Sequence, residues 1–119
     1  DLNWTLDCDG GFYGFDGPKN TDRGHQFGSS KAPCTYVTLS TSDFKTGVKK
    51  IMLNTSGAKD TNGECTVTVG GKKIGETITL TNTATDYTLE SSEVLSGEIV
   101  ISYTQTSKKA IYIKSIKIN

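Results

Sequence analysis

Apolar and polar side chains alternate along most of this chain, and that alternation restricts it to one class of fold. In "ECTVTVGG", Cys65, Val67 and Val69 fall on the same face of an extended backbone, and "CTYVTLS" places Val37 and Leu39 in the same way. No stretch keeps the 3.6-residue period of a helix over three turns. The sequence therefore predicts an all-β protein.

Turn residues separate the predicted strands at short intervals. In "VGGKKI", Gly70 and Gly71 can take the positive φ angles of a tight hairpin, which would join the strand ending at Val69 to one starting near Ile74. "VKKIMLNTSG" is more continuously apolar, which is typical of a strand in the middle of a sheet.

The alternation slips in the closing stretch, "AIYIKSIKIN". Ile111 and Ile113 fall on one face, whereas Ile116 and Ile118 fall on the opposite one. A β-bulge at Lys114–Ser115 would turn the second pair inward again. The alternative is a strand that is buried on both faces at different points along its length.

The spacing of the strands favours two packed sheets. They recur about every 8–12 residues without a helical segment between them. We predict a single domain over residues 1–119, an antiparallel two-sheet β-sandwich with jelly-roll topology. An immunoglobulin-like sandwich is the second choice, because Trp4 lies at the extreme N-terminus and no cysteine pair flanks a tryptophan in mid-chain.

Residues 7–30, "DCDGGFYGFDGPKNTDRGHQFGSS", break the pattern and are predicted to be an irregular, loop-rich segment. Flat aromatic rings match the C–H faces of sugar rings, so the aromatic residues here indicate a stacking platform for a carbohydrate. The alternative is that these rings close the open edge of the sandwich. The candidate ligand-binding residues are Trp4, Phe12, Tyr13, Phe15, Asp16, Asp22, Arg23 and His25.

The aspartates of the same segment suggest a calcium hypothesis. "DCDGG" places Asp7 and Asp9 before a glycine pair, and hard cations bind carboxylate oxygens. The spacing does not match the twelve-residue calcium loop, and turn-forming hydrogen bonds explain most such clusters. A structural calcium ion held by Asp7 and Asp9 is the one cofactor considered.

The charges of the chain are balanced, with 13 basic and 13 acidic side chains and a formal net charge of zero at pH 7. No global field attracts nucleic acid or an anionic membrane. Arg23 is the only arginine, and lysine is less suited to bidentate contacts with phosphates or bases. No apolar run is long enough to cross a bilayer. We expect neither nucleic-acid binding nor membrane insertion.

No catalytic arrangement stands out in the sequence. His25 is the only histidine and has no close carboxylate partner, and no serine lies in a nucleophile elbow. The glutamates fall mostly at turns or strand ends, so no pair for glycoside cleavage is favoured. We predict that the chain is not an enzyme. A hydrolase would need a catalytic pair that only folding brings together.

The three cysteines, Cys8, Cys34 and Cys65, are an odd set. Three intramolecular pairings are open, and no CxxC spacing indicates a zinc site. The simplest interpretation is that they are small buried or loop thiols.

Several strand motifs together resemble a known kind of domain. "HQFGSSKAPCTYVTLSTSDF", "GVKKIMLNTSGA", "CTVTVGG" and "GEIVISYTQTSKKAIYIKSIKI" resemble a small β-sandwich domain found in secreted proteins of gut Bacteroidetes. That domain is similar to the galactose-binding-domain-like jelly rolls, which include many carbohydrate-binding modules. The likeness covers residues 24–119. It implies an exported, non-catalytic accessory domain that is part of a larger secreted protein, and it transfers no binding residue.

Two functions follow as expectations. The first is a non-catalytic carbohydrate-binding module of a secreted or cell-surface bacterial protein, with the N-terminal aromatic residues stacking on the sugar. The second is a structural or protein-interaction domain of a surface protein, without a small ligand, whose exposed strand edges make the contacts.

Overall fold

The strands account for most of the chain. The computed structural model describes residues 2–14 and 23–119. Its strands are β1 (Thr5–Cys8), β2 (Phe12–Gly14), β3 (His25–Phe27), β4 (Cys34–Thr41), β5 (Val48–Gly57), β6 (Glu64–Val69), β7 (Lys72–Lys73), β8 (Ile78–Thr79), β9 (Thr85–Leu95), β10 (Ile99–Lys109) and β11 (Ile111–Ile118). Nowhere in the described ranges is there a helix long and apolar enough to cross a membrane.

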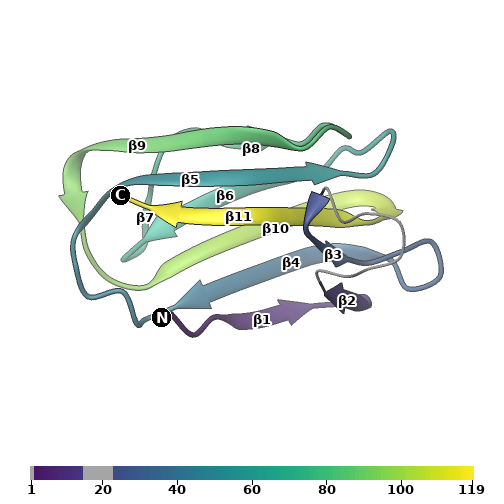
Figure 1. The fold of residues 1–119 in the computed structure, drawn as a ribbon, viewed down its shortest axis with the longest axis horizontal. Coiled ribbons are helices and arrows are strands. Elements are labelled where there is room, and N and C mark those ends of the chain that lie inside the picture. The colour runs from purple at the N-terminus through teal and green to yellow at the C-terminus, as the bar shows by residue number, and fades with distance from the viewer. Residues whose placement is uncertain (1, 15–22) are drawn as a thin grey trace.

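The strands form two antiparallel sheets that pack face to face (Figure 1). The first has the order β1-β4-β10-β6-β7, with β8 also paired to β6, and the second has the order β2-β3-β11-β5-β9. From β3 to β6 the chain changes sheet at every step. The predicted all-β sandwich is confirmed, and "VKKIMLNTSG" lies inside its sheet, between β11 and β9.

The predicted hairpin at "VGGKKI" is also present. Val69 pairs with Lys72, and the two glycines between them have φ angles of 59° and 85°. Both angles lie in the left-handed region that the tight turn requires.

The core consists of the inward faces of the two sheets. Tyr103 of β10 is fully buried and reaches across the sandwich, where its hydroxyl donates a 3.0 Å hydrogen bond to Thr55 Oγ1 of β5. Thr55 in turn donates to the carbonyl oxygen of Tyr112 at 2.6 Å. This chain of hydrogen bonds ties the two sheets together at the centre of the molecule. The strand face predicted for "ECTVTVGG" is buried as expected, and Ile99, Ile101 and Tyr103 of the neighbouring β10 are buried with it.

The predicted bulge in β11 is confirmed. Ile113 pairs with Thr55 and Ser115 pairs with the next residue of β5, Asn54, so Lys114 is the extra residue. The bulge shifts the side-chain alternation by one position, and Ile116 consequently packs against the same core as Ile113.

Residues 7–30, predicted to be irregular, contain the end of β1 and two further short strands. β2 and β3 have three residues each, and β3 pairs with β11 only from Ile111 to Ile113. Beyond Ile113, this edge of β11 has no strand partner among the described residues. The second sheet is therefore shorter on this side than the first, and the inner face of β1 and β4 is left partly uncovered.

Candidate functional site

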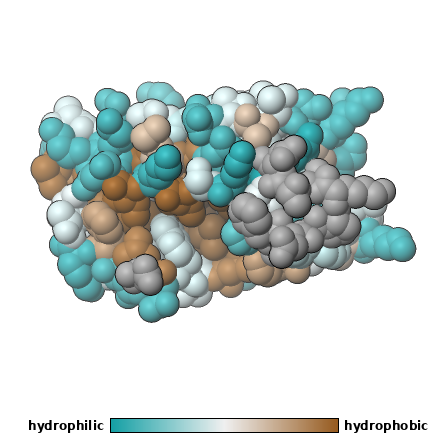
Figure 2. Space-filling view, viewed as in Figure 1, coloured by the Kyte–Doolittle hydropathy of each residue, from teal (hydrophilic) through white to brown (hydrophobic). Residues whose placement is uncertain are grey.

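An open pocket lies where β2 and β3 end short of the full length of β11. Its volume is about 370 Å³, within the range of small-ligand sites. We call it the edge pocket, and it is lined by Trp4, Leu6, Phe12, His25, Phe27, Leu39, Ile113, Lys114, Ser115 and Ile116. The same face of the molecule shows a band of apolar surface bordered by hydrophilic side chains (Figure 2).

The floor of the edge pocket comes from the first sheet. Leu6 of β1 is paired with Leu39 of β4, so their side chains point to the same, inner face. Trp4 lies just before β1, two residues from Leu6, and is half-buried against the core. A ligand in the pocket would therefore contact Trp4, Leu6 and Leu39. A longer second sheet would bury these side chains in the core.

One wall of the edge pocket is a stack of aromatic rings from β2 and β3. The Phe12 ring is 5.0 Å from Phe27 and 6.0 Å from His25, centroid to centroid, and nearly parallel to His25, at 9°. Phe27 is buried, whereas 51% of Phe12 is exposed. Stacking against Phe27 and His25 holds the Phe12 ring in place. The exposed part of the ring remains free to contact a ligand.

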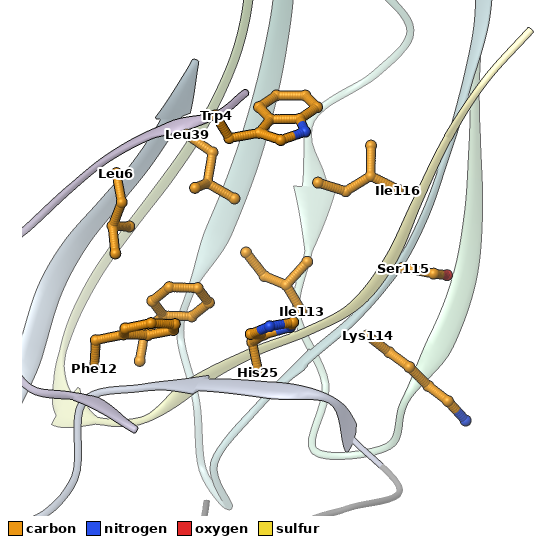
Figure 3. Close-up of a pocket in the computed structure, with 10 residues that line it drawn as sticks. Trp4, Leu6, Phe12, His25, Leu39, Ile113, Lys114, Ser115 and Ile116 are labelled. Atoms are coloured by element: carbon orange, nitrogen blue, oxygen red, sulfur yellow. The ribbon is translucent and has the colours of Figure 1, made fainter. Parts of the chain in front are cut away.

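The bulge of β11 forms the third side. Ile113 and Ile116 face the pocket, whereas Lys114 extends away from the other labelled side chains (Figure 3). Gly24, just before β3, packs tightly against this bulge with a φ of +87°. A methyl group on Gly24 would lie 2.4 Å from Lys114 Cα and 2.5 Å from the Ile113 carbonyl oxygen. The position of the aromatic wall therefore depends on a glycine at this contact.

Substituting Gly24 should displace the wall. Gly24→Ala is expected to destabilise the fold by about 1–3 kcal/mol more than Gly71→Ala, because a clash with backbone adds to the strain of a positive φ. Gly71 is a matched control, since its φ is +85° and an added methyl group would meet nothing within 4 Å. Urea unfolding measures both variants. Equal losses of stability would show that β3 does not need the close contact with β11.

The structure brings together three of the candidate ligand-binding residues, Trp4, Phe12 and His25, in the edge pocket. Tyr13 follows Phe12 in β2 but does not line the pocket, and its hydroxyl hydrogen bonds with Ser29 Oγ at 2.8 Å. Arg23 lies over the Tyr112 ring, 5.0 Å from its centroid, and donates to the Gly57 carbonyl oxygen. The other three candidates, Phe15, Asp16 and Asp22, lie outside the described residues.

The two proposed calcium ligands hydrogen bond to β4. The Asp9 carboxylate accepts from the backbone N–H groups of Thr35 and Tyr36, at 2.8 and 3.2 Å, and from the Thr35 hydroxyl. Asp7 accepts from the Tyr36 hydroxyl at 3.1 Å. Across the described part of the chain, no group of three or more His, Cys, Asp or Glu side chains is placed to hold a metal ion.

The Asp9 hydrogen bonds give a pH-dependent contribution to stability. The Thr35 hydroxyl, more than any other group, lowers the pKa of the Asp9 carboxyl below its ordinary value of 3.8. Because the folded pKa is below the unfolded one, this contribution is present above about pH 4 and is lost as the pH falls through the lowered pKa. Asp9→Asn should be less stable than wild type in urea unfolding at neutral pH, and the difference should shrink in acid. A difference that stays constant with pH would contradict this role.

The residues that sequence reasoning missed are Leu6, Phe27, Leu39 and the bulge residues of β11. Each apolar one fits a period-two strand pattern and looks like an ordinary core residue. The predicted bulge at Lys114–Ser115 was the one feature of the sequence that pointed to this part of the fold.

The edge pocket is mainly apolar, with aromatic rings on one wall. Among the described residues, no carboxylate lines the pocket. The polar groups are few: the Trp4 indole N–H, His25, Ser115 and Lys114. Exposed ring surface with a few hydrogen-bonding groups suits a ligand that has both C–H faces and hydroxyls.

Comparison with solved structures confirms the sandwich fold. The chain is similar to TmCBM61 in complex with β-1,4-galactotriose, at a TM-score of 0.61 and 13% identity, over 98% of this chain and 87% of that one. It is similar to CBM86, a low-affinity xylan-binding module of the gut symbiont Roseburia intestinalis, at a TM-score of 0.52 and 12% identity, over 100% and 95%. No family model matches the chain, and no curated protein matches it.

Proposed function

We propose that this domain binds carbohydrate without catalysis, as an accessory module of a secreted or cell-surface bacterial protein, and that the edge pocket is its binding site. The observation that carries the proposal is the exposed, immobilised ring of Phe12 on one side of an open apolar pocket. The carbohydrate-binding modules of similar fold support the choice of ligand class.

The arrangement of the rings sets how a sugar would bind. Trp4 lies at one end of the pocket, and Phe12 and His25 lie at the other (Figure 3). A glycan lying along the free edge of β11 would place C–H faces on the rings of Trp4 and Phe12. Its hydroxyls would meet His25 at the rim. Because these rings are held by packing in the folded protein, they lose little side-chain entropy on binding.

The experiment that tests this function is a glycan-array screen of the domain, followed by calorimetric titration of the glycans that bind. The expected result is saturable binding to one class of neutral glycans, with the weak to moderate affinity of a shallow site. A blank array with correctly folded protein would contradict the proposal. Running the screen with calcium and again with EDTA tests the calcium hypothesis, because a metal needed at the site makes binding sensitive to the chelator.

An assembly function through the sheet edges is less well supported. The outer edge strand of the second sheet, β9, carries exposed Glu90 and Glu93, and charged side chains on an edge oppose pairing with another strand. Light scattering after size-exclusion chromatography separates the two functions. The binding-module proposal predicts a monomer, whereas self-association would favour an assembly domain.

A further inference from the structure

Two of the three thiols, those of Cys8 and Cys34, lie close to the same glycine, Gly10. The Cys8 thiol donates a 3.5 Å hydrogen bond to the Gly10 carbonyl oxygen, and Cys34 Sγ would be 2.6 Å from a methyl group at Gly10. Cys8 and the Gly10 backbone also lie close enough to Cys34 to affect the pKa of its thiol. A side chain at Gly10 would also meet the carbonyl oxygens of Pro33 and Ala32, at 2.5 and 2.7 Å, so only a glycine fits beside Cys34.

Strand register excludes the pairings with Cys65. Cys8 pairs with Val37 on β4, Val37 with Tyr103 on β10, and Tyr103 with Cys65 on β6. Adjacent strands are about 4.8 Å apart, so three steps place Cys65 roughly 14 Å from Cys8. Cys34 is on β4, two steps or roughly 10 Å from β6. A disulfide needs Cα atoms within about 7 Å of each other, so both distances are too long.

We propose that Cys8 and Cys34 are a site of intramolecular disulfide formation, and that the oxidised protein carries this bond with Cys65 as a free thiol. Among the three pairings left open by the sequence, this is the one whose two sulfur atoms lie beside the same residue, Gly10. The bond would close a loop that contains β2 and β3 and with them Phe12, His25 and Phe27. It would therefore link β1 covalently to β4 at the base of the loop that carries the aromatic wall of the edge pocket.

The chemistry is thiol–disulfide exchange with a small disulfide such as oxidised glutathione. Cys8, which is half-buried, attacks the donor as its thiolate, forms a mixed disulfide and releases one glutathione thiol. Cys34, which is buried, then gives up its proton to solvent and attacks the Cys8 sulfur, and the second glutathione thiol leaves. The two cysteine sulfurs are oxidised and one donor disulfide is reduced to two thiols.

The second step should be slow at neutral pH. Burial first, and the adjacent Cys8 thiol next, raise the pKa of the Cys34 thiol to about 12. Because the thiolate is the attacking species, the rate of bond formation should rise with pH until that pKa is approached. Cys65 has a similar pKa of about 12, raised by burial, but has no partner thiol within reach.

The test incubates the folded full chain with oxidised glutathione at mildly alkaline pH, then alkylates free thiols in denaturant and maps the peptides by mass spectrometry. The expected product links the Cys8 and Cys34 peptides and carries the alkyl label on Cys65. Thermal unfolding should shift upward on the order of 10 °C on oxidation, because the bond closes a loop in the unfolded chain. Reduction should reverse the shift.

Cysteine variants make the assignment specific. Cys65→Ala should still form the link and show the same shift in melting temperature, whereas Cys8→Ser, at a half-buried position, should fold and show neither. Three alkylated thiols after oxidation, a link that includes Cys65, or a Cys8–glutathione adduct that Cys34 does not resolve would each overturn the proposal. None of these readouts depends on carbohydrate binding.

Discussion

Phe12→Ala is expected to weaken glycan binding about tenfold or more while leaving the fold intact. The ring is 51% exposed, and its inner side rests on Phe27 and His25, so its loss removes stacking area from the ligand more than packing from the core. Central aromatic anchors commonly contribute about 2 kcal/mol or more, and about 1.4 kcal/mol corresponds to tenfold. Calorimetric titration of the glycan selected by the array measures the change.

Tyr13→Ala is the matched control for Phe12→Ala. Tyr13 is the next residue of β2, is 38% exposed and hydrogen bonds to Ser29 instead of lining the edge pocket. Its loss should leave the affinity within about twofold of wild type, the usual effect of a neutral surface change of up to about 0.5 kcal/mol. Equal weakening by both substitutions, or by neither, would remove the edge pocket as the binding site.

Tyr103→Ala should be among the most destabilising single substitutions in the chain. The side chain is fully buried, fills the space between the sheets and donates to Thr55. Truncating a buried aromatic ring costs about 3–5 kcal/mol, which lowers the melting temperature on the order of 10–20 °C in a domain of this size. Urea unfolding followed by circular dichroism measures the loss in free energy of unfolding.

Two tyrosine variants separate the contributions to this effect. Tyr103→Phe keeps the ring and loses the hydrogen bond to Thr55, which should cost about 1 kcal/mol. Tyr36→Ala removes a tyrosine whose hydroxyl bonds to Asp7 on the exposed outer face of β4 and should cost less than Tyr103→Ala. If Tyr103→Ala were no worse than Tyr36→Ala, the assignment of Tyr103 to the core would be wrong.

The strands of the sandwich could be predicted because their signals are local. A period of two places Cys65, Val67 and Val69 on one face wherever the strand sits in the sheet, and two consecutive glycines require the hairpin after Val69. The side-chain alternation changes phase between Ile113 and Ile116, and few backbone arrangements allow both residues to face the core. The structure has a bulge at Lys114.

The candidate site could be predicted only in part, because it depends on contacts between distant segments. Strands of three residues, such as β2 and β3, are too short to show alternation among glycines. Phe12 and Tyr13 are adjacent in the sequence, but neighbouring residues of a strand point to opposite sides, and only Phe12 lines the edge pocket. Leu39 lines the edge pocket because β3 ends short of it, and the residues next to Leu39 in the sequence do not show where β3 ends.

Trp4 allows the most direct test, because it is the only tryptophan of the chain and lines the edge pocket. Its intrinsic fluorescence can be followed while the glycan selected by the array is titrated into wild-type protein and into Phe12→Ala. A sugar in the edge pocket predicts a saturable change in Trp4 emission, with the same dissociation constant as calorimetry, and a strongly weakened response in the variant. Calorimetric binding without any change in Trp4 emission would place the glycan elsewhere and contradict the central proposal.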